Sequence, residues 1–185
     1  MQLLYASRDG HAHRIADHIA ARLADAAIAA VPQNVADSDP AAFEPNALVV
    51  LVAAVRYGKH LPEAERFLSR FCRLQMRPPL AFLSVNLTAR KPNKKTAENN
   101  PYLRKLLHRH ALKPVLAQAI AGRLDYPRYT RFDRFMIRLI MTMTAGPTDP
   151  TAVVEFTDWN EVDDLAGRIA QLTRESPVTA ESTVR

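Results

Sequence analysis

A short polar loop follows the first apolar run of the sequence and joins it to a helix. The loop is Ser7-Arg8-Asp9-Gly10-His11-Ala12. A phosphate group there would contact unpaired backbone N–H groups at the positive end of the helix dipole, and the Ser7 hydroxyl. Gly10 permits the close backbone approach that such contacts require. The chain contains neither a P-loop nor a GxGxxG fingerprint, and this loop alone is equally typical of an ordinary capped turn.

Two more loops with chemically useful side chains follow the next strong apolar runs. Residues 53–59 are AAVRYGK, in which the backbone around Gly58 can approach a flat ring and Tyr57 can stack on one. Residues 84–92 are SVNLTARKP, which offer a hydroxyl, an amide and cations. Each loop alone is also typical of a plain turn. Their occurrence at three successive strand ends favours a binding site.

An alternation of strands and helices would bring these loops together. We expect strands near 2–6, 29–35, 47–54, 80–86 and 115–121, a β-like stretch at 152–156, and helices near 11–29, 61–75, 97–111 and 159–173. This order predicts parallel βαβ units in a doubly wound α/β sheet. Ligands of such sheets bind at the carboxyl ends of the strands, so the three loops should line one edge.

The positive charge of the chain is concentrated in one segment. Between Arg90 and Ala145 lie 13 Lys and Arg residues but only three acidic ones, whereas the whole chain carries +6. This asymmetry predicts an anionic partner, which could be a membrane surface, a nucleic acid or an acidic small molecule. Within the segment, residues 131–143 have helical spacing, with an apolar stripe formed by Phe132, Phe135, Met136, Leu139, Ile140 and Met143. The stripe and its flanking arginines suit an interfacial membrane helix or an apolar substrate site, and a core helix with snorkelling arginines is the alternative.

Several classes of protein are disfavoured by composition. A single cysteine, Cys72, excludes an internal disulfide and a metal site built on cysteine pairs. His108 and His110 lie on a basic helix and are expected at the surface rather than on a metal, so we predict no metal site. We expect no secretory signal and no membrane-spanning helix, because no apolar stretch approaches about 20 residues. One domain, 1–174, should be followed by a disordered tail at 175–185.

Four segments together resemble one known family. They are YASRDGHAHRIA, AVRYGKH, FLSVNLTARKP and RLDYPRYTRFDRFMIRLIM. The chain is similar, from residue 2 to about 173, to the flavodoxin-like, menaquinone-dependent protoporphyrinogen IX dehydrogenases of bacterial haem synthesis. The resemblance implies a five-stranded parallel sheet of order 2-1-3-4-5. It also implies that a basic amphipathic insertion, about 123–148, splits the last strand.

The resemblance further implies FMN as the cofactor. Residues 7–12 would hold its phosphate, and the loops at 54–58 and 84–90 would flank its ring. The implied FMN-binding residues are Ser7, Arg8, Asp9, Gly10, His11, Ala12, Ala54, Arg56, Tyr57, Gly58, Ser84, Asn86, Leu87 and Arg90. Ala12 departs from the family pattern, which usually has a threonine there. We therefore expect weaker FMN binding unless His11 or His13 supplies a replacement donor.

The activity implied is oxidation of protoporphyrinogen IX to protoporphyrin IX, with menaquinone or ubiquinone as acceptor. The implied partners of the substrate are Lys91, Arg123, Tyr126, Arg128 and Arg131, with Arg90 a further candidate for its propionates. The apolar stripe would face lipid or the quinone, and no side chain is assignable as a catalytic base. The protein would lie on the cytoplasmic face of the bacterial inner membrane, against its anionic surface and without nucleic acid, and a homo-oligomer is compatible. A flavodoxin-type electron carrier and an NAD(P)H:quinone reductase remain as alternatives.

Overall fold

The computed structural model describes residues 1–128, 130–143 and 147–175. Its strands are β1 (Gln2–Ala6), β2 (Pro32–Asn34), β3 (Val49–Arg56), β4 (Lys59–His60), β5 (Leu80–Asn86), β6 (Leu116–Ala121), β7 (Arg123–Asp125) and β8 (Val153–Glu155). Its helices are α1 (His11–Asp25), α2 (Pro62–Phe71), α3 (Pro101–Arg109), α4 (Arg131–Met143) and α5 (Trp159–Glu175). The tail expected at 175–185 lies outside the described residues, except for Glu175 at the end of α5.

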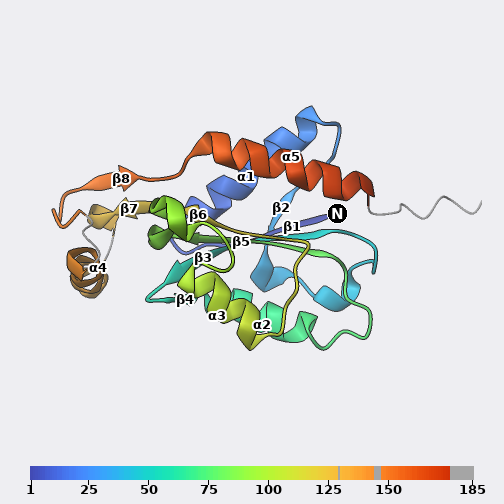
Figure 1. Ribbon diagram of the computed structural model, residues 1–185, viewed down its shortest axis with the longest axis horizontal. Coiled ribbons are helices and arrows are strands. Elements are labelled where there is room, and N and C mark those ends of the chain that lie inside the picture. Colours follow the sequence, from blue (N-terminus) through green and yellow to red (C-terminus); the bar gives the residue numbers. More distant parts are fainter. Residues whose placement is uncertain (129, 144–146, 176–185) are drawn as a thin grey trace, which may run out of the picture.

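Five parallel strands form the central sheet in the order β2-β1-β3-β5-β6. Counted among the parallel strands alone, this is the predicted order 2-1-3-4-5. The short β4 pairs antiparallel with the end of β3. Helices α1 and α5 cover one face of the sheet and α2 and α3 cover the other (Figure 1). The flavodoxin-like doubly wound architecture is thereby confirmed.

The core has two halves because side chains of a strand alternate between the faces of the sheet. On β3, Val50 and Val52 pack with α1 and α5, whereas Leu51 and Ala53 pack with α2 and α3. Residues Val49 to Ala53 are fully buried. A strand covered on both faces requires apolar residues at every position, which explains its continuous apolar run. The polar residues of this region therefore begin where the strand leaves the core.

The insertion, which contains β7, α4 and β8, lies beyond the carboxyl edge of the sheet (Figure 1). Here the structure differs from the expected split strand, because β8 pairs antiparallel with β7 and does not extend the central sheet. The ladder between β5 and β6 ends at the pair Asn86 and Ala121, so β7 has no neighbour in the central sheet. Its backbone groups pair with 153–155 instead. No helix that the structure describes is long and apolar enough to cross a membrane.

Candidate cofactor site at the carboxyl edge of the sheet

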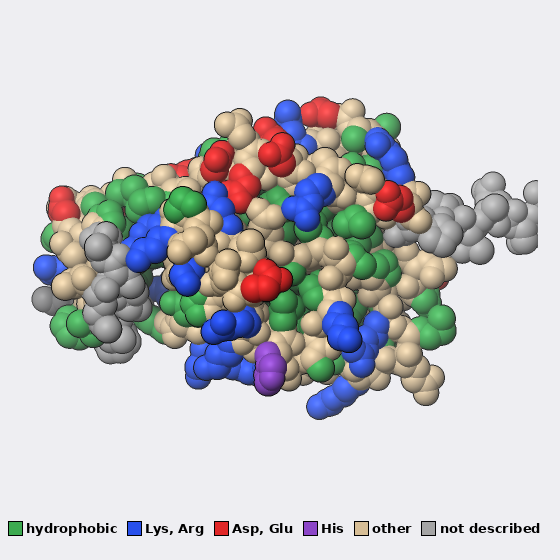
Figure 2. Space-filling model, viewed as in Figure 1, with side chains coloured by type: hydrophobic (Ala, Val, Ile, Leu, Met, Phe, Trp, Pro, Cys, Tyr) green, Lys and Arg blue, Asp and Glu red, His purple; other side chains and the backbone are tan. Residues whose placement is uncertain are grey.

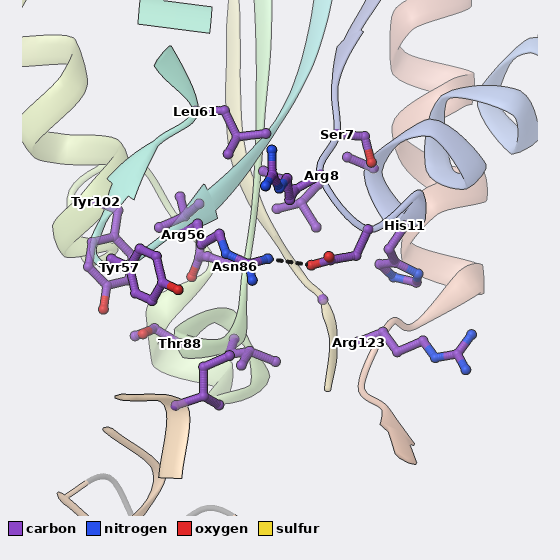
Figure 3. A pocket seen from close by; sticks show the side chains of 18 of the residues that line it. Ser7, Arg8, His11, Arg56, Tyr57, Leu61, Asn86, Thr88, Tyr102 and Arg123 are labelled. Carbon is purple, nitrogen blue, oxygen red and sulfur yellow. Dashed lines mark hydrogen bonds and ion pairs between the residues drawn. The ribbon is translucent and has the colours of Figure 1, made fainter. Parts of the chain in front are cut away.

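A cleft, partly open to solvent, lies where the three predicted loops meet (Figure 3). Parallel strands direct the loops after β1, β3 and β5 to the same edge, and α3 and α4 add side chains. The lining residues are Ser7, Arg8, Asp9, His11, Ala12, Ala54, Val55, Arg56, Tyr57, Gly58, Leu61, Val85, Asn86, Leu87, Thr88, Arg90, Tyr102, Gly122, Arg123, Ile137 and Met141. Most of the predicted cofactor-binding residues are thus brought together.

One end of the cleft offers unused hydrogen-bond donors. Gly10 precedes α1 with φ of 85°, a left-handed conformation that suits glycine, and no side chain caps the helix. The first backbone N–H groups of a helix have no partner within it. The Ser7 hydroxyl oxygen is buried and has no hydrogen-bond partner among the described residues. Buried donors without partners fit a bound anion such as a phosphate group.

His11 and Arg123 lie close together at this end (Figure 3). His11 Nε2 is 2.7 Å from Thr157 Oγ1, and the Thr157 hydroxyl donates to the carbonyl of Ala121 at 2.7 Å. Burial lowers the pKa of His11, and the charges of Arg14 and Arg123 lower it further against the opposing effect of Glu155.

His13, the other candidate replacement donor, does not line the cleft. Its ring stacks on Tyr5 at a centroid distance of 4.0 Å, and its Nε2 is 3.4 Å from Asp17. Of the two candidate histidines, His11 lines the cleft and His13 does not.

The opposite side of the cleft is formed by the turn after β3. Arg56 Nη1 makes a 2.7 Å ion pair with Asp9, which ties this turn to the first loop. Tyr57 and Gly58 both have left-handed φ values, 50° and 75°. A Cβ on Gly58 would stand 3.6 Å from the ring of Tyr102. The tight turn leaves Tyr57 43% exposed, and its side chain lines the cleft, where it can contact a flat ligand.

The third loop is held by a buried polar network. Ser84 is fully buried, does not line the cleft, and its Oγ is 2.9 Å from His60 Nε2. The Asn86 amide donates to Ser84 Oγ at 3.1 Å and accepts from Ala89 N and Asn100 Nδ2, both at 3.1 Å. Burial lowers the pKa of His60 to about 4. The Ser84 side chain positions the loop. The Asn86 side chain mainly does the same, although it also lines the cleft. Leu87, Thr88 and Arg90 face the cleft.

The predicted substrate-binding residues are only partly brought together. Arg123 lines the cleft and is 3.0 Å from Asp125, and Arg90 lines it while donating to the carbonyl of Leu87 at 2.9 Å. Lys91 is exposed outside the lining. Tyr126 is fully buried, and its hydroxyl donates to the carbonyl of Pro147 at 2.8 Å, which removes it from the substrate set. The side chains of Arg128 and Arg131 lie outside the described part of the structure.

Helix α4 has apolar side chains on two sides. Ile137 and Met141, four residues apart, line the cleft. Phe135 and Leu139, members of the predicted stripe, are 65% and 48% exposed. The other stripe side chains, those of Phe132, Met136, Ile140 and Met143, lie outside the described part. Sequence reasoning missed Tyr102, Ile137 and Met141, although the helical spacing of the last two was a usable signal.

Charge is distributed unevenly over the face drawn in Figure 2. Lys and Arg side chains gather over α3 and towards α4, and acidic side chains gather over α5 (Figure 2). The exposed cations of α3 are Arg104, Lys105 and Arg109. Among the residues that the structure describes, no cluster of three His, Cys, Asp or Glu side chains could hold a metal ion.

Comparison with known proteins gives consistent matches. A family model described as a flavodoxin domain matches residues 2–151. A relative from Escherichia coli (strain K12), named protoporphyrinogen IX dehydrogenase (quinone), is 40% identical over 92% of this chain and 94% of its own length. A relative of the same name from Leishmania major is 38% identical over 92% of this chain and 74% of its own length. A solved flavodoxin structure from Streptococcus pneumoniae matches with a TM-score of 0.52 and 11% identity, over 95% of this chain and 98% of that one.

Proposed function

This chain belongs to the quinone-dependent protoporphyrinogen IX dehydrogenase family of flavodoxin-domain proteins, and from that premise we propose that it oxidises protoporphyrinogen IX with FMN as cofactor. The product is protoporphyrin IX, and a membrane quinone, menaquinone or ubiquinone, accepts the electrons. The enzyme is an oxidoreductase of haem synthesis. The observation that carries the proposal is the cleft, which joins unused anion-binding donors at one end to an exposed tyrosine and apolar side chains at the other.

The residues present fit FMN. The Ser7 hydroxyl and the first amides of α1 would hold the phosphate, and Ala54 to Gly58 and Leu87 to Arg90 would flank the ring. When bound, FMN supplies the two-electron redox chemistry, and the protein supplies placement and electrostatics. The ion pair between Arg56 and Asp9 would fix the distance between the phosphate loop and the turn beside the ring.

The substrate would occupy the part of the cleft between the Tyr57 turn and α4. Ile137 and Met141 offer apolar contact for a macrocycle and exclude water from it. Arg90 offers a cation for a propionate there, because guanidinium groups bind carboxylates with paired hydrogen bonds. Arg123, the other cation of the lining that the sequence assigned to the propionates, lies beside His11 at the phosphate end. We keep Arg128 and Arg131 as further candidates on the sequence pattern alone.

The outer side of α4 would face the membrane that contains the quinone. Phe135 and Leu139 are exposed there, and Arg138 is exposed on the same helix. Apolar side chains beside cations suit an interfacial helix, and each cation near an anionic leaflet contributes about 1 kcal/mol. The opposite side of α4 lines the cleft. This arrangement would therefore place the cleft next to the quinone, on the cytoplasmic face of the membrane.

Vesicle sedimentation tests the membrane surface. We expect the protein to sediment with vesicles that contain anionic phosphatidylglycerol and much less with pure phosphatidylcholine. Phe135→Ser should weaken this binding several-fold. Met76→Ser is the matched control, because Met76 is 69% exposed but lies outside α4. Equal binding by the two variants would contradict the membrane role of α4.

Anaerobic turnover tests the activity. The protein is purified with added FMN, and protoporphyrinogen IX is supplied with a menaquinone or ubiquinone analogue while porphyrin fluorescence is followed. Porphyrin formation that depends on both the protein and the quinone is the expected result. Bound flavin without turnover would instead indicate an electron carrier, turnover of NADPH with quinone would indicate a reductase, and no flavin binding would overturn the proposal.

A further inference from the structure

A neutral His11 side chain has no ring N–H left for a phosphate, because its one N–H is used within the protein. Thr157 has one hydroxyl proton, which it donates to the carbonyl of Ala121 at 2.7 Å. The contact of 2.7 Å between Thr157 Oγ1 and His11 Nε2 therefore requires the imidazole to donate. In a neutral ring, the remaining nitrogen, Nδ1, then has a lone pair and no proton. A phosphate oxygen also accepts, so it cannot form a hydrogen bond with Nδ1 of the neutral ring.

Protonation of His11 would reverse this, because Nδ1 would then carry an N–H group and the ring a positive charge. In the chain alone, the surroundings oppose protonation. His11 is partly buried at a helix N-terminus, with Arg14 of α1 and Arg123 of β7 nearby, and these conditions lower its pKa. The carboxylate that raises the pKa of His11, Glu155 of β8, is bound to Arg14 Nη1 at 2.8 Å and to Trp159 Nε1 at 2.7 Å.

A phosphate dianion at the Ser7–Ala12 loop changes this balance. It brings a double negative charge to a partly buried site where the Ser7 hydroxyl has no hydrogen-bond partner among the described residues. An opposite charge a few ångströms from a histidine favours its protonated form. Ala12 has no hydroxyl, so an imidazolium N–H of His11 is the side-chain donor that the first turn of α1 can offer in the cleft, in addition to the Ser7 hydroxyl of the loop.

We propose that His11 binds the FMN phosphate as an imidazolium, so that the chain takes up a proton when FMN binds. This rests on the proposed function, in which the loop holds the FMN phosphate. Two consequences follow. FMN affinity should fall with rising pH, by up to about tenfold per pH unit once the phosphate is fully dianionic, above pH about 7. Riboflavin, which has no phosphate, should bind without this pH dependence, so the preference for FMN over riboflavin should be greatest at lower pH.

Calorimetry of the refolded apoprotein tests the proton uptake. FMN is titrated at pH 7 in several phosphate-free buffers of different ionisation enthalpy, and dissociation constants are measured from pH 7 to 9 by quenching of flavin fluorescence. For the wild-type chain we expect uptake approaching one proton and a Kd that rises with pH. His11→Gln keeps a neutral donor for Thr157 and should show neither effect. His13→Gln, at the partly exposed histidine two residues on, should behave as the wild type.

The outcomes separate this inference from the function on which it rests. FMN binding without proton uptake, or with the same pH dependence in His11→Gln, would overturn the role of His11 and leave the cofactor assignment intact. Absence of FMN binding at every pH would overturn the cofactor assignment itself. If His11→Gln does not fold, NMR titration of the wild-type His11 ring replaces it. Its pKa should rise when FMN is added, and an unchanged pKa would overturn the inference.

Discussion

At the scale of single residues, the cleft contains two kinds of buried polar group. The Ser7 hydroxyl has no partner among the described residues, whereas both atoms of the Asn86 amide are used within the protein. A buried polar group without a partner destabilises the fold, by about 1–3 kcal/mol, unless a ligand satisfies it. The first residue therefore indicates ligand binding, and the second indicates positioning of a loop.

Ser7→Ala should separate cofactor binding from stability. The variant loses a hydrogen bond to a charged group, which contributes about 1.5–3 kcal/mol, so FMN affinity should fall by about 10-fold to 100-fold. The apoprotein should be as stable as the wild type, or more so, because the substitution removes an unsatisfied hydroxyl. Fluorescence titration and urea unfolding measure the two effects. Riboflavin is the control, and an equal loss of riboflavin affinity would place the Ser7 hydroxyl away from the phosphate.

Asn86→Ala should act on the fold. It removes the hydrogen bonds that the Asn86 amide makes with Ser84, Asn100 and the backbone N–H of Ala89, at an expected total cost of about 2–4 kcal/mol in the free energy of unfolding. Asn99→Ala is the control, since Asn99 is exposed and should change stability by less than about 0.5 kcal/mol. Urea unfolding compares them, and similar stabilities would contradict the positioning role.

At the scale of elements, the sequence pattern predicted α4 but not its orientation. The six-residue stripe was expected to be the functional face, and the structure places Ile137 and Met141, on the other side, in the cleft. Periodicity identifies faces of a helix, but a helix with apolar residues on two sides does not specify which side packs inwards. The pairing of β8 with β7 was missed for a similar reason, because strand partners depend on where the neighbouring ladder ends.

Two alanine variants on α4 test this orientation. Ile137 is partly buried and packs with Leu124 and Tyr126, so Ile137→Ala should lower the free energy of unfolding by about 1 kcal/mol or more and impair turnover. Phe135→Ala should leave stability within about 0.5 kcal/mol, because the side chain is exposed. Thermal unfolding and turnover with a water-soluble quinone compare them. A larger stability loss for Phe135→Ala would reverse the assigned faces.

At the scale of the whole molecule, the alternation of apolar runs was sufficient to predict the parallel sheet and the edge where its loops meet. Continuous apolar runs such as 49–53 are typical of strands covered on both faces, and together with the alternating helices they favour this architecture. The buried contacts among β4, β5 and the N-cap of α3 were not predictable, because His60, Ser84 and Asn100 are far apart in sequence and each is an ordinary loop or strand residue. Long-range pairing of polar side chains leaves no local pattern.

That buried network should make the stability of the whole molecule depend on pH. His60 has a pKa of about 4 in the folded chain because burial opposes its charge, against 6.5 when unfolded. Below pH 6.5 the unfolded chain binds a proton that the folded chain does not, so the free energy of unfolding falls as pH falls towards 4. The expected loss between pH 6.5 and 5 is about 2 kcal/mol. Hydrogen bonds from His110 and Arg109 lower the pKa of Glu65 in spite of its burial. Below pH 4.5, the ordinary pKa of a glutamate, Glu65 therefore adds a further loss in the free energy of unfolding.

Urea unfolding between pH 4.5 and 7.5 tests the contribution of His60. His60→Gln keeps a polar partner for Ser84 and does not titrate, so its stability should fall much less steeply with decreasing pH. Part of the slope should remain, because burial lowers the pKa of His11 as well. His108→Gln, at an exposed position of α3, should keep the slope of the wild type. If the stability of His60→Gln had the same pH slope as that of the wild type, acid would destabilise the fold through other groups. His60 would then take up its proton as readily in the folded chain as in the unfolded one.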